Sequence, residues 1–343
     1  MKQAIDRRVL LQTSAATAVA ACLPRALFAK DIAFADIPRS DFGFATTCDD
    51  VAKGRDLAGK TVLITGCNSG LGYESLRTLA AHGAHVIGAA RTQEKADQAC
   101  ASVGGKTTPV VCELTSMQSV VQCAEAVQAL DKPVDVLMCN AGVMALPKLE
   151  QVDVNGVMLE RQFVINHLGH YLLTRRLLPE VQAAPAGRIV NVSSGGYAMA
   201  PKGGIQFDNL SGDGGYQAFK AYGQTKLANI LLAKELTRLY ADDGSGLTAN
   251  AIHPGIVATN LGRYMRGGKM RDPNEPLRDG MKTPAQGAAT QVYVAIDERL
   301  DGVSGYYFED CNPVQTKGSY ATDPALAERL WAVSAELVQP WLV

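Results

Sequence analysis

The sequence predicts an α/β fold, built as one doubly wound parallel sheet with helices on both faces. Three observations carry the prediction. Short apolar runs alternate with segments of helical spacing, the apolar runs are continuous, and Gly-rich or polar turns separate them. Continuous apolar strands are typical of a parallel sheet covered on both sides. With 47% hydrophobic and 20% charged residues, the composition excludes a disordered, collagen-like or coiled-coil chain.

The alternation begins at about residue 56 and shows no internal repeat. The expected strands are 61–65, 84–90, 108–112, 134–139, 187–193, 247–252 and 304–308. The expected helices are 73–82, 93–103, 116–130, 156–181, 217–240 and 283–297. Residues 260–282 are rich in Gly, Arg and Pro, and we expect a mobile loop that covers the substrate. The chain therefore divides into a lead-in of residues 36–55 and one domain of residues 56–343.

Residues 1–35 read as an export segment. Lys2, Arg7 and Arg8 precede an uncharged run over residues 9–23. That run is shorter than the ~20 residues that a transmembrane helix needs, and it fits the apolar part of a signal peptide. Residues 6–12 resemble the bacterial twin-arginine signal, which exports folded proteins.

Small residues that suit cleavage follow at Ala29 and at 33–35. We expect the mature protein to be periplasmic and to have no stable membrane span. Residues 19–22 also resemble a lipobox, which would leave a lipid on Cys22. Two alternatives therefore stay open, namely a chain anchored to the membrane through its N-terminus and a cytoplasmic chain.

The charge and the cysteines exclude several partners. A net charge of −1 gives no electrostatic drive toward nucleic acid. The eight cysteines contain no CxxC pair and no metal-ligand spacing, which predicts neither a disulfide framework nor a metal site. His167, His170 and His253 lack acidic or cysteine companions at ligand spacing, so we interpret them as core or turn residues.

A glycine-rich loop follows the first expected strand and opens a helix. Gly66 allows the tight turn, Gly70 lets the backbone approach a pyrophosphate, and Gly72 lets helix and strand pack closely. The spacing is GxxxGxG, which differs from the commoner GxGxxG. The candidate cofactor residues of this loop are Gly66, Asn68, Ser69, Gly70, Leu71 and Gly72.

The end of the second strand bears on cofactor choice. An NAD site places an acidic residue there to hold the ribose 2′-hydroxyl, and here that position is Ala90. Arg91 follows directly and is able to form charge-assisted bonds to a 2′-phosphate. We therefore predict NADP as the cofactor.

Tyr222 and Lys226 lie four residues apart on an expected helix and so share one face. A nearby ammonium favours the phenolate, and we expect it to lower the pKa of Tyr222 toward working pH. A tyrosine in this state passes a proton to or from a carbonyl oxygen. Tyr216 and Lys220 have the same spacing, but Tyr216 follows two glycines at or before the helix start, so we prefer Tyr222.

Together these motifs resemble the short-chain dehydrogenase/reductase family, over about residues 56–312. Asn140-Ala141-Gly142 is similar to the family's motif after the fourth strand. Asn166 and Ser194 stand where the family has its helix Asn and catalytic Ser. The segment 253–255, followed by Thr259, resembles the segment beside the nicotinamide. The resemblance implies a Rossmann-type fold.

The resemblance also implies roles. Tyr222 is then the general acid or base, Lys226 lowers its pKa and holds the nicotinamide ribose, Ser194 bonds the substrate oxygen, and Asn166 holds a water of the proton relay. The further implied cofactor residues are Glu113, Leu114, Asn140, Ala141, Gly142, Pro254, Gly255 and Thr259, with Tyr222 and Lys226.

Two departures from the family pattern concern the cofactor site. Glu113 replaces the usual Asp near the adenine, which puts its adenine contact in doubt. Cys67 and Cys139 replace commoner small or amide residues, and each either packs as a small hydrophobe or makes the site sensitive to oxidation.

Within the family, residues 222–229 and the wide gap from Ser194 to Tyr222 resemble the retinol-dehydrogenase-like branch, with protochlorophyllide reductase as a neighbour. The implied function is NADP(H)-dependent interconversion of a lipophilic carbonyl and an alcohol by a homo-oligomer. Two alternatives stay open, namely reduction of an activated C=C bond and a non-catalytic NADPH sensor.

Overall fold

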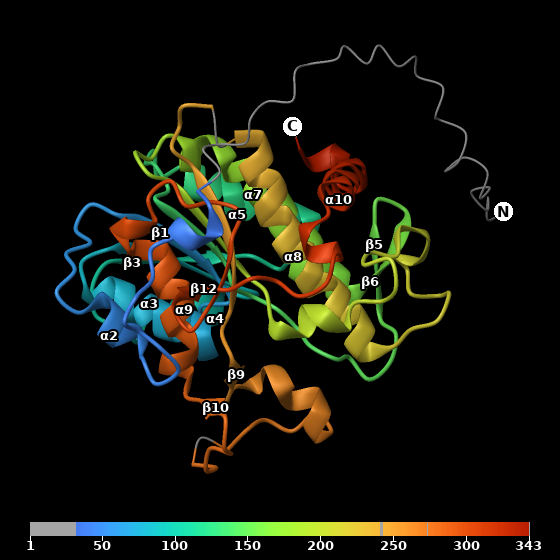
Figure 1. Ribbon diagram of the computed structural model, residues 1–343, viewed down its shortest axis with the longest axis horizontal. Coiled ribbons are helices and arrows are strands. Elements are labelled where there is room, and N and C mark those ends of the chain that lie inside the picture. The colour runs from blue at the N-terminus through green and yellow to red at the C-terminus, as the bar shows by residue number, and fades with distance from the viewer. Residues whose placement is uncertain (1–31, 241–242, 273, 343) are drawn as a thin grey trace.

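The computed structural model describes residues 32–240, 243–272 and 274–342. The twin-arginine motif, the lipobox and Ala29 lie outside the described residues. The core of the fold is an eight-stranded sheet whose strands are parallel except for β12 (Figure 1). In spatial order the strands are β12 (Asn312–Pro313), β11 (Tyr307–Glu309), β8 (Thr248–His253), β7 (Arg188–Val192), β4 (Val136–Cys139), β1 (Thr61–Thr65), β2 (His85–Ala90) and β3 (Thr107–Val111).

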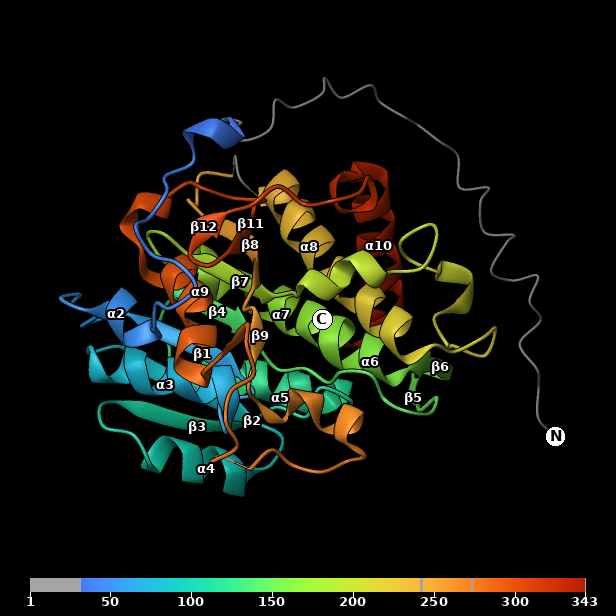
Figure 2. The ribbon, with the colours of Figure 1, turned by 60° about the horizontal axis from the view of Figure 1, so that its bottom comes forward.

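Helices cover both faces of this sheet, which confirms the predicted doubly wound architecture (Figure 2). One face carries α2 (Cys48–Ala52), α3 (Gly70–Ala81), α4 (Gln93–Ala101) and α9 (Pro284–Ile296). The other carries α5 (Met117–Gln128), α7 (Gly169–Gln182), α8 (Ala218–Tyr240) and α10 (Pro324–Leu337). Successive side chains of a strand point to opposite faces. Leu63 accordingly belongs to one core cluster, and Val62 and Ile64 belong to the other.

The strand order reverses between β1 and β4, because the chain runs outward through β2 and β3 before it returns. In doubly wound sheets, ligands bind outside the carboxyl ends of the strands at such a switch point. The glycine-rich loop leaves β1 at that place, so the fold itself positions it for cofactor binding.

The expected helix over 156–181 is wrong in its first turn. Residues 156–160 instead belong to a hairpin of β5 (Gln151–Val154) and β6 (Val157–Glu160). Asn155 and Gly156 form its two-residue turn with φ of 53° and 83°, the backbone of the turn that suits a hairpin best. The chain then continues through α6 (Arg161–Phe163) and a π-helical segment, η2 (Val164–Leu168), into α7.

The segment ahead of β1 packs into the domain. Ile37, Cys48 and Val51 are buried with α9 in the core cluster of that face. The Tyr306 hydroxyl donates a hydrogen bond to the carbonyl oxygen of Ile32, so the contacts of this segment begin at the first described residue.

Residues 256–282 form an excursion that projects from the body of the molecule (Figure 1). Its neck is a short parallel pair of β9 (Ile256–Val257) and β10 (Met281–Lys282). A 3-10 helix, η5 (Asn260–Arg266), lies beyond the neck. Within the described part of the chain, none of the helices is both long and apolar enough to cross a bilayer.

Candidate active site

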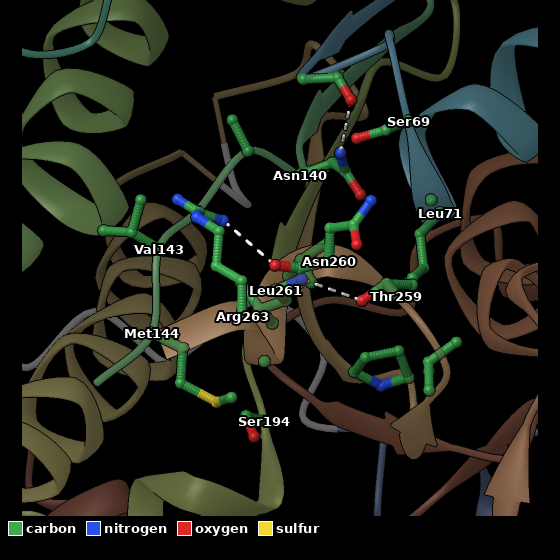
Figure 3. Close-up of a pocket in the computed structure, with 18 of the residues that line it drawn as sticks. Ser69, Leu71, Asn140, Val143, Met144, Ser194, Thr259, Asn260, Leu261 and Arg263 are labelled. Carbon is green, nitrogen blue, oxygen red and sulfur yellow. Dashed lines mark hydrogen bonds between the residues drawn. The ribbon is translucent and has the colours of Figure 1, made fainter. Parts of the chain in front are cut away.

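One large cavity opens at the carboxyl ends of β1, β4 and β7, with a volume of about 1490 Å³ (Figure 3). Every residue that the sequence marked for catalysis or cofactor binding lines it, except Gly72 and Asn166. Those two lie directly behind the lining. The glycine-rich loop forms one end of the cavity, and Ser194, Tyr222 and Lys226 form the other.

The glycine loop forms a cradle that side chains would fill. A Cβ atom on Gly72 would lie 2.3 Å from the Gly66 carbonyl oxygen and 2.5 Å from Asn140 Nδ2. Gly66 and Gly70 have φ of 71° and 57°, which favours glycine. The loop leads into the N-terminus of α3, whose free N–H groups favour an anion. The residues present therefore fit the phosphates of a dinucleotide.

Thr65 ties this loop to the segment after β4, and the sequence analysis missed it. Its hydroxyl accepts hydrogen bonds from the backbone N–H groups of Asn140 and Ala141, both at 3.0 Å. His170 Nε2 lies 2.8 Å from the same hydroxyl. Asn140 Nδ2 returns a bond to the Thr65 carbonyl at 2.8 Å. A buried threonine at the end of β1 thus fixes the positions of Asn140 and Ala141 in the cavity lining.

Two cations stand at the end of β2. Arg91 is exposed at the cavity rim beside the buried Ala90. Lys95, half-buried on α4, lines the same part of the cavity and was not anticipated from the sequence. The sequence could have indicated Lys95, because it lies four residues after Arg91 in the first turn of the helix that follows.

Glu113 turns its carboxylate toward its own loop. Its Oε1 accepts hydrogen bonds from the backbone N–H and the hydroxyl of Thr115, at 3.0 and 2.9 Å. Glu113 and Leu114 both line the cavity, where the family resemblance places the adenine.

Tyr222 and Ser194 meet at the other end of the cavity. Both side chains lie against Gly196, and Ser194 Oγ accepts a bond of 3.0 Å from the Gly196 N–H. A Cβ on Gly196 would lie only 3.0 Å from the Tyr222 ring, so this glycine allows the close approach. Tyr222 and Ser194 therefore lie next to each other in the lining of the cavity.

Lys226 lies beneath Tyr222, with its Nζ 5.6 Å from the ring centroid. The ammonium donates a 2.9 Å hydrogen bond to the Val192 carbonyl. Burial lowers the pKa of Lys226 to about 8. Burial also raises the pKa of Tyr222 to about 12, against a smaller lowering by Ser194. The expected lowering of the Tyr222 pKa is therefore not seen, because the loss of solvation outweighs the hydrogen bond.

Asn166 sits in the π-helical turn and holds the wall of the cavity. Its Oδ1 accepts a 2.8 Å bond from the Val143 N–H. Its Nδ2 donates to the Val143 carbonyl at 2.9 Å and to the Thr225 hydroxyl at 3.0 Å. The wider π turn thus places one amide between the β4 loop and α8. No sequence periodicity marks such a turn.

The competing Tyr216 and Lys220 pair does not line the cavity. The Tyr216 hydroxyl donates a 2.7 Å bond to the Leu146 carbonyl and accepts one from Gln162, while Lys220 is exposed. Of the two YxxxK matches, the fold brings only Tyr222 and Lys226 to Ser194.

The segment after β8 closes the cavity from the side of the excursion. Pro254, Gly255 and Thr259 all line it. A Cβ on Gly70 would lie 3.2 Å from the methyl group of Thr259, so the two segments touch. Thr259 Oγ1 accepts a 3.3 Å bond from the Leu261 N–H, and the Arg263 side chain extends from here toward Val143 (Figure 3).

The cysteines play no visible part in the cavity lining beyond Cys112. Cys67 and Cys139 are buried behind it, and burial raises the pKa of the Cys139 thiol to about 12. All seven described cysteines are free thiols. Across residues 32–240, 243–272 and 274–342, no three His, Cys, Asp or Glu side chains gather as a metal site would require.

Comparisons with known proteins agree with this site. The chain is 38% identical over 310 residues to short-chain dehydrogenase TIC 32 B, chloroplastic, of Brassica napus, covering 88% of this chain and 95% of that protein. It is 38% identical over 301 residues to human retinol dehydrogenase 14, covering 82% and 86%.

Among solved structures, an uncharacterized protein from Mycobacterium paratuberculosis matches with a TM-score of 0.68 and 31% identity, covering 84% of this chain and 97% of that one. A putative NAD(P)-dependent gluconate 5-dehydrogenase from Beutenbergia cavernae, with bound NADP, matches with a TM-score of 0.55 and 26% identity, covering 78% and 99%. The family model described as short chain dehydrogenase matches residues 60–269. The chain thus belongs to the short-chain dehydrogenase/reductase family and is retinol-dehydrogenase-like within it.

Proposed function

We propose that this protein is an NADP(H)-dependent oxidoreductase that interconverts a lipophilic aldehyde or ketone with its alcohol. The observation that carries the proposal is the placement of Tyr222 and Ser194 together in the cavity lining, above the buried Lys226. A cofactor cradle opens into the same cavity. A proton donor, a hydrogen-bond donor to oxygen and a dinucleotide site are the parts that carbonyl reduction requires.

When bound, the nicotinamide supplies or accepts the hydride. In the direction of reduction, Tyr222 donates its hydroxyl proton to the substrate oxygen as negative charge develops there. Its pKa of about 12 keeps that proton in place until it is needed. Ser194 donates a second hydrogen bond to the same oxygen. The positive charge of Lys226, held below, favours the phenolate that remains. In oxidation the same groups act in reverse.

The preference for NADP over NAD rests on Arg91 and Lys95, two cations beside the apolar Ala90. A hydrogen bond to a charged group contributes about 1.5–3 kcal/mol, or roughly 10- to 150-fold in affinity. We expect Arg91→Ala to raise the dissociation constant of NADPH within this range and to leave that of NADH unchanged. Titration of both cofactors by fluorescence checks this. Equal affinity of the native protein for NADH and NADPH would contradict the preference.

The proposal of a lipophilic substrate is supported by the lining of the cavity. Its apolar members are Met144, Leu146, Ile165, Met199, Phe219, Leu261 and Met265. Burial of apolar substrate surface against such side chains contributes about 25 cal/mol per Å². The retinol dehydrogenases among the relatives agree with a substrate of this class.

The deciding experiment follows NADPH oxidation over a panel of aliphatic, aromatic and isoprenoid aldehydes and ketones, with an activated C=C compound added. Tyr222→Phe is the control, because it keeps the ring and removes the proton. We expect carbonyl turnover in the native protein, a loss of at least about 10²-fold in the variant, and similar NADPH binding in both. Turnover of the C=C compound alone would replace the carbonyl proposal, and NADPH binding without any turnover would favour a sensor.

We further propose export of the mature chain by the twin-arginine route and assembly as a homo-oligomer. The export proposal rests on residues 6–12, and the assembly proposal rests on the family. Fractionation with N-terminal sequencing, and light scattering of the purified protein, test the two separately. Full-length protein recovered from the cytosol would contradict export, and a monomeric mass would contradict assembly.

A further inference from the structure

A buried lysine lies beside the active site and takes no part in the chemistry above. Lys282, on β10, has a side chain only 1% exposed and forms an ion pair with Asp310. Its Nζ also lies 5.3 Å from the ring centroid of Phe44, in the segment ahead of β1. Burying a lysine is costly unless it is paired, so this position must offset that cost through its contacts.

Lys282 packs flat against the backbone of Gly255. A Cβ on Gly255 would lie 3.0 Å from Lys282 Cδ and 3.1 Å from Cε. Gly255 has φ of 89°, so its backbone takes a course that other residues rarely follow. The Ala258 N–H also donates a 2.9 Å bond to the Lys282 carbonyl. The lysine therefore supports the segment that lines the cavity between β8 and the excursion.

Asp310 is held in place by an unusual turn. It joins β11 to β12, and both central residues have positive φ, 50° at Asp310 and 60° at Cys311. Neither is glycine, so the turn needs support from its surroundings. The Cys311 N–H donates a 3.2 Å bond to Thr290 of α9, and Asn312 Nδ2 donates a 3.0 Å bond to the Asp310 carbonyl.

The segment ahead of β1 supports the same turn from outside. Ser40 Oγ donates a 2.9 Å bond to the Cys311 carbonyl. Asn312 Nδ2 donates a 3.0 Å bond to the carbonyl of Phe42. Residues 40–44, the β11–β12 turn and Lys282 thus form one continuous set of contacts that ends at Gly255. We call these residues the anchor.

We propose that Lys282 is a positioning residue, whose ion pair with Asp310 holds the Gly255 segment and the neck of the excursion against the nicotinamide end of the cavity. The inference rests on the proposed cofactor. The anchor reaches the cavity at Gly255, whereas the two cations proposed to hold the 2′-phosphate, Arg91 and Lys95, stand at the end of β2. Loss of the ion pair is therefore expected to disturb the nicotinamide end selectively.

The test compares two probes on the full chain. In the proposed function NADPH would occupy both the adenosine and the nicotinamide ends of the cavity, whereas adenosine 2′,5′-bisphosphate carries the adenosine and a 2′-phosphate but no nicotinamide. We expect Lys282→Met, which keeps an unbranched side chain as far as the ε carbon and removes the ammonium, to weaken NADPH binding about tenfold. Binding of the bisphosphate should stay within about twofold, because hydrogen bonds at that end are unchanged. Isothermal titration measures both constants.

A second variant guards against misfolding. Asp310→Asn keeps a residue that tolerates positive φ and removes the same ion pair. We expect Asp310→Asn to change the ratio of the NADPH affinity to the bisphosphate affinity as Lys282→Met does. The double variant should show no further change, because the two residues act through one contact. Lys60→Met is the matched control. It breaks the 2.9 Å ion pair with Asp135, neither residue of which lines the cavity.

The outcomes separate the two proposals. Two results in Lys282→Met and Asp310→Asn overturn the positioning role while the proposed function stands. One is an equal loss of affinity for NADPH and for the bisphosphate, and the other is no change in either affinity. A changed ratio in Lys60→Met also overturns it, since the effect would then follow from any lost ion pair. A native protein that binds neither probe refutes the proposed function, and the positioning role falls with it.

Discussion

The floor and the roof of the cavity are built differently. The floor consists of Ser194, Tyr222 and Lys226, with Asn166 directly behind the lining, and the side chains of Asn166 and Lys226 are buried in bonds to backbone carbonyls. The roof is the excursion of residues 256–282, where Met265 and Met270 are 58% and 63% exposed. The Arg263 and Arg266 side chains of the roof bond to backbone carbonyls of their own loop. The proton-transfer groups are thus held by contacts that need no substrate, whereas the arginines of the roof bond within their own loop. We infer that the floor sets the reaction and the roof sets the choice of substrate.

The largest expected effect comes from a substitution that removes hydrogen bonds behind the floor. Asn166→Ala removes three hydrogen bonds and leaves both backbone groups of Val143 without that partner. Each such buried group costs about 1–3 kcal/mol. We expect kcat to fall by about 10²-fold or more and the melting temperature to drop.

The matched control is Asn250→Ala, which removes two buried amide bonds, of 2.7 and 3.0 Å, to Val303 and Tyr306, neither of which lines the cavity. It should lower the melting temperature and keep kcat. If kcat falls equally in both variants, general loosening explains the result and the special role of the floor is wrong.

The pH dependence of the reaction tests whether the charge of Lys226 in the floor is needed. Lys226 has a pKa lowered by burial to about 8, so it is charged below that pH and neutral above it. Tyr222, with a pKa raised by burial to about 12, keeps its proton throughout this range. Reduction needs both the proton and the positive charge. We expect its rate to be level below about pH 8 and then to fall by about tenfold per pH unit. A level profile up to pH 10 would show that the charge of Lys226 is dispensable.

The smallest expected effect belongs to the roof. Met265→Ser removes an exposed apolar side chain that lines the cavity. We expect KM for a lipophilic substrate to rise about two- to fivefold, with kcat and the melting temperature unchanged. Met158→Ser, at a residue 45% exposed on β6 and outside the lining, should change neither. Equal effects of the two variants on KM would remove the roof from substrate binding.

The floor and the sheet were more accessible to sequence reasoning than the roof and its anchor. The strands of the parallel sheet are continuous apolar runs, and the glycine loop is a local pattern between a strand and a helix. The hairpin at Asn155 and Gly156 carried an Asn-Gly signal, but Val157, Met158 and Leu159 also suited the first turn of a helix. Helix α10 was not among the expected helices, although its start has a local signal, since Asp323 caps it ahead of Pro324.

Other features leave no local trace in the sequence. The π turn over 164–168 follows no spacing of residues that a helical pattern would reveal. The raised pKa of Tyr222 follows from how much solvent the fold excludes, which a YxxxK spacing does not contain. Lys282 and Asp310 are separated by 28 positions, and only the path of the chain through α9 and β11 brings them together.

If the chain is made as a precursor, as we propose, the contacts of the segment ahead of β1 favour one of the two cleavage positions. Ile32 accepts a bond from Tyr306, and Ile32 and Phe34 pack against the core cluster that holds α9. A cut after Ala35 would remove both residues from an already folded protein, whereas a cut after Ala29 would leave them in place. If the leader is removed during export, as we propose, the mature chain is expected to begin at Lys30, with its first contacts already supporting the far edge of the sheet.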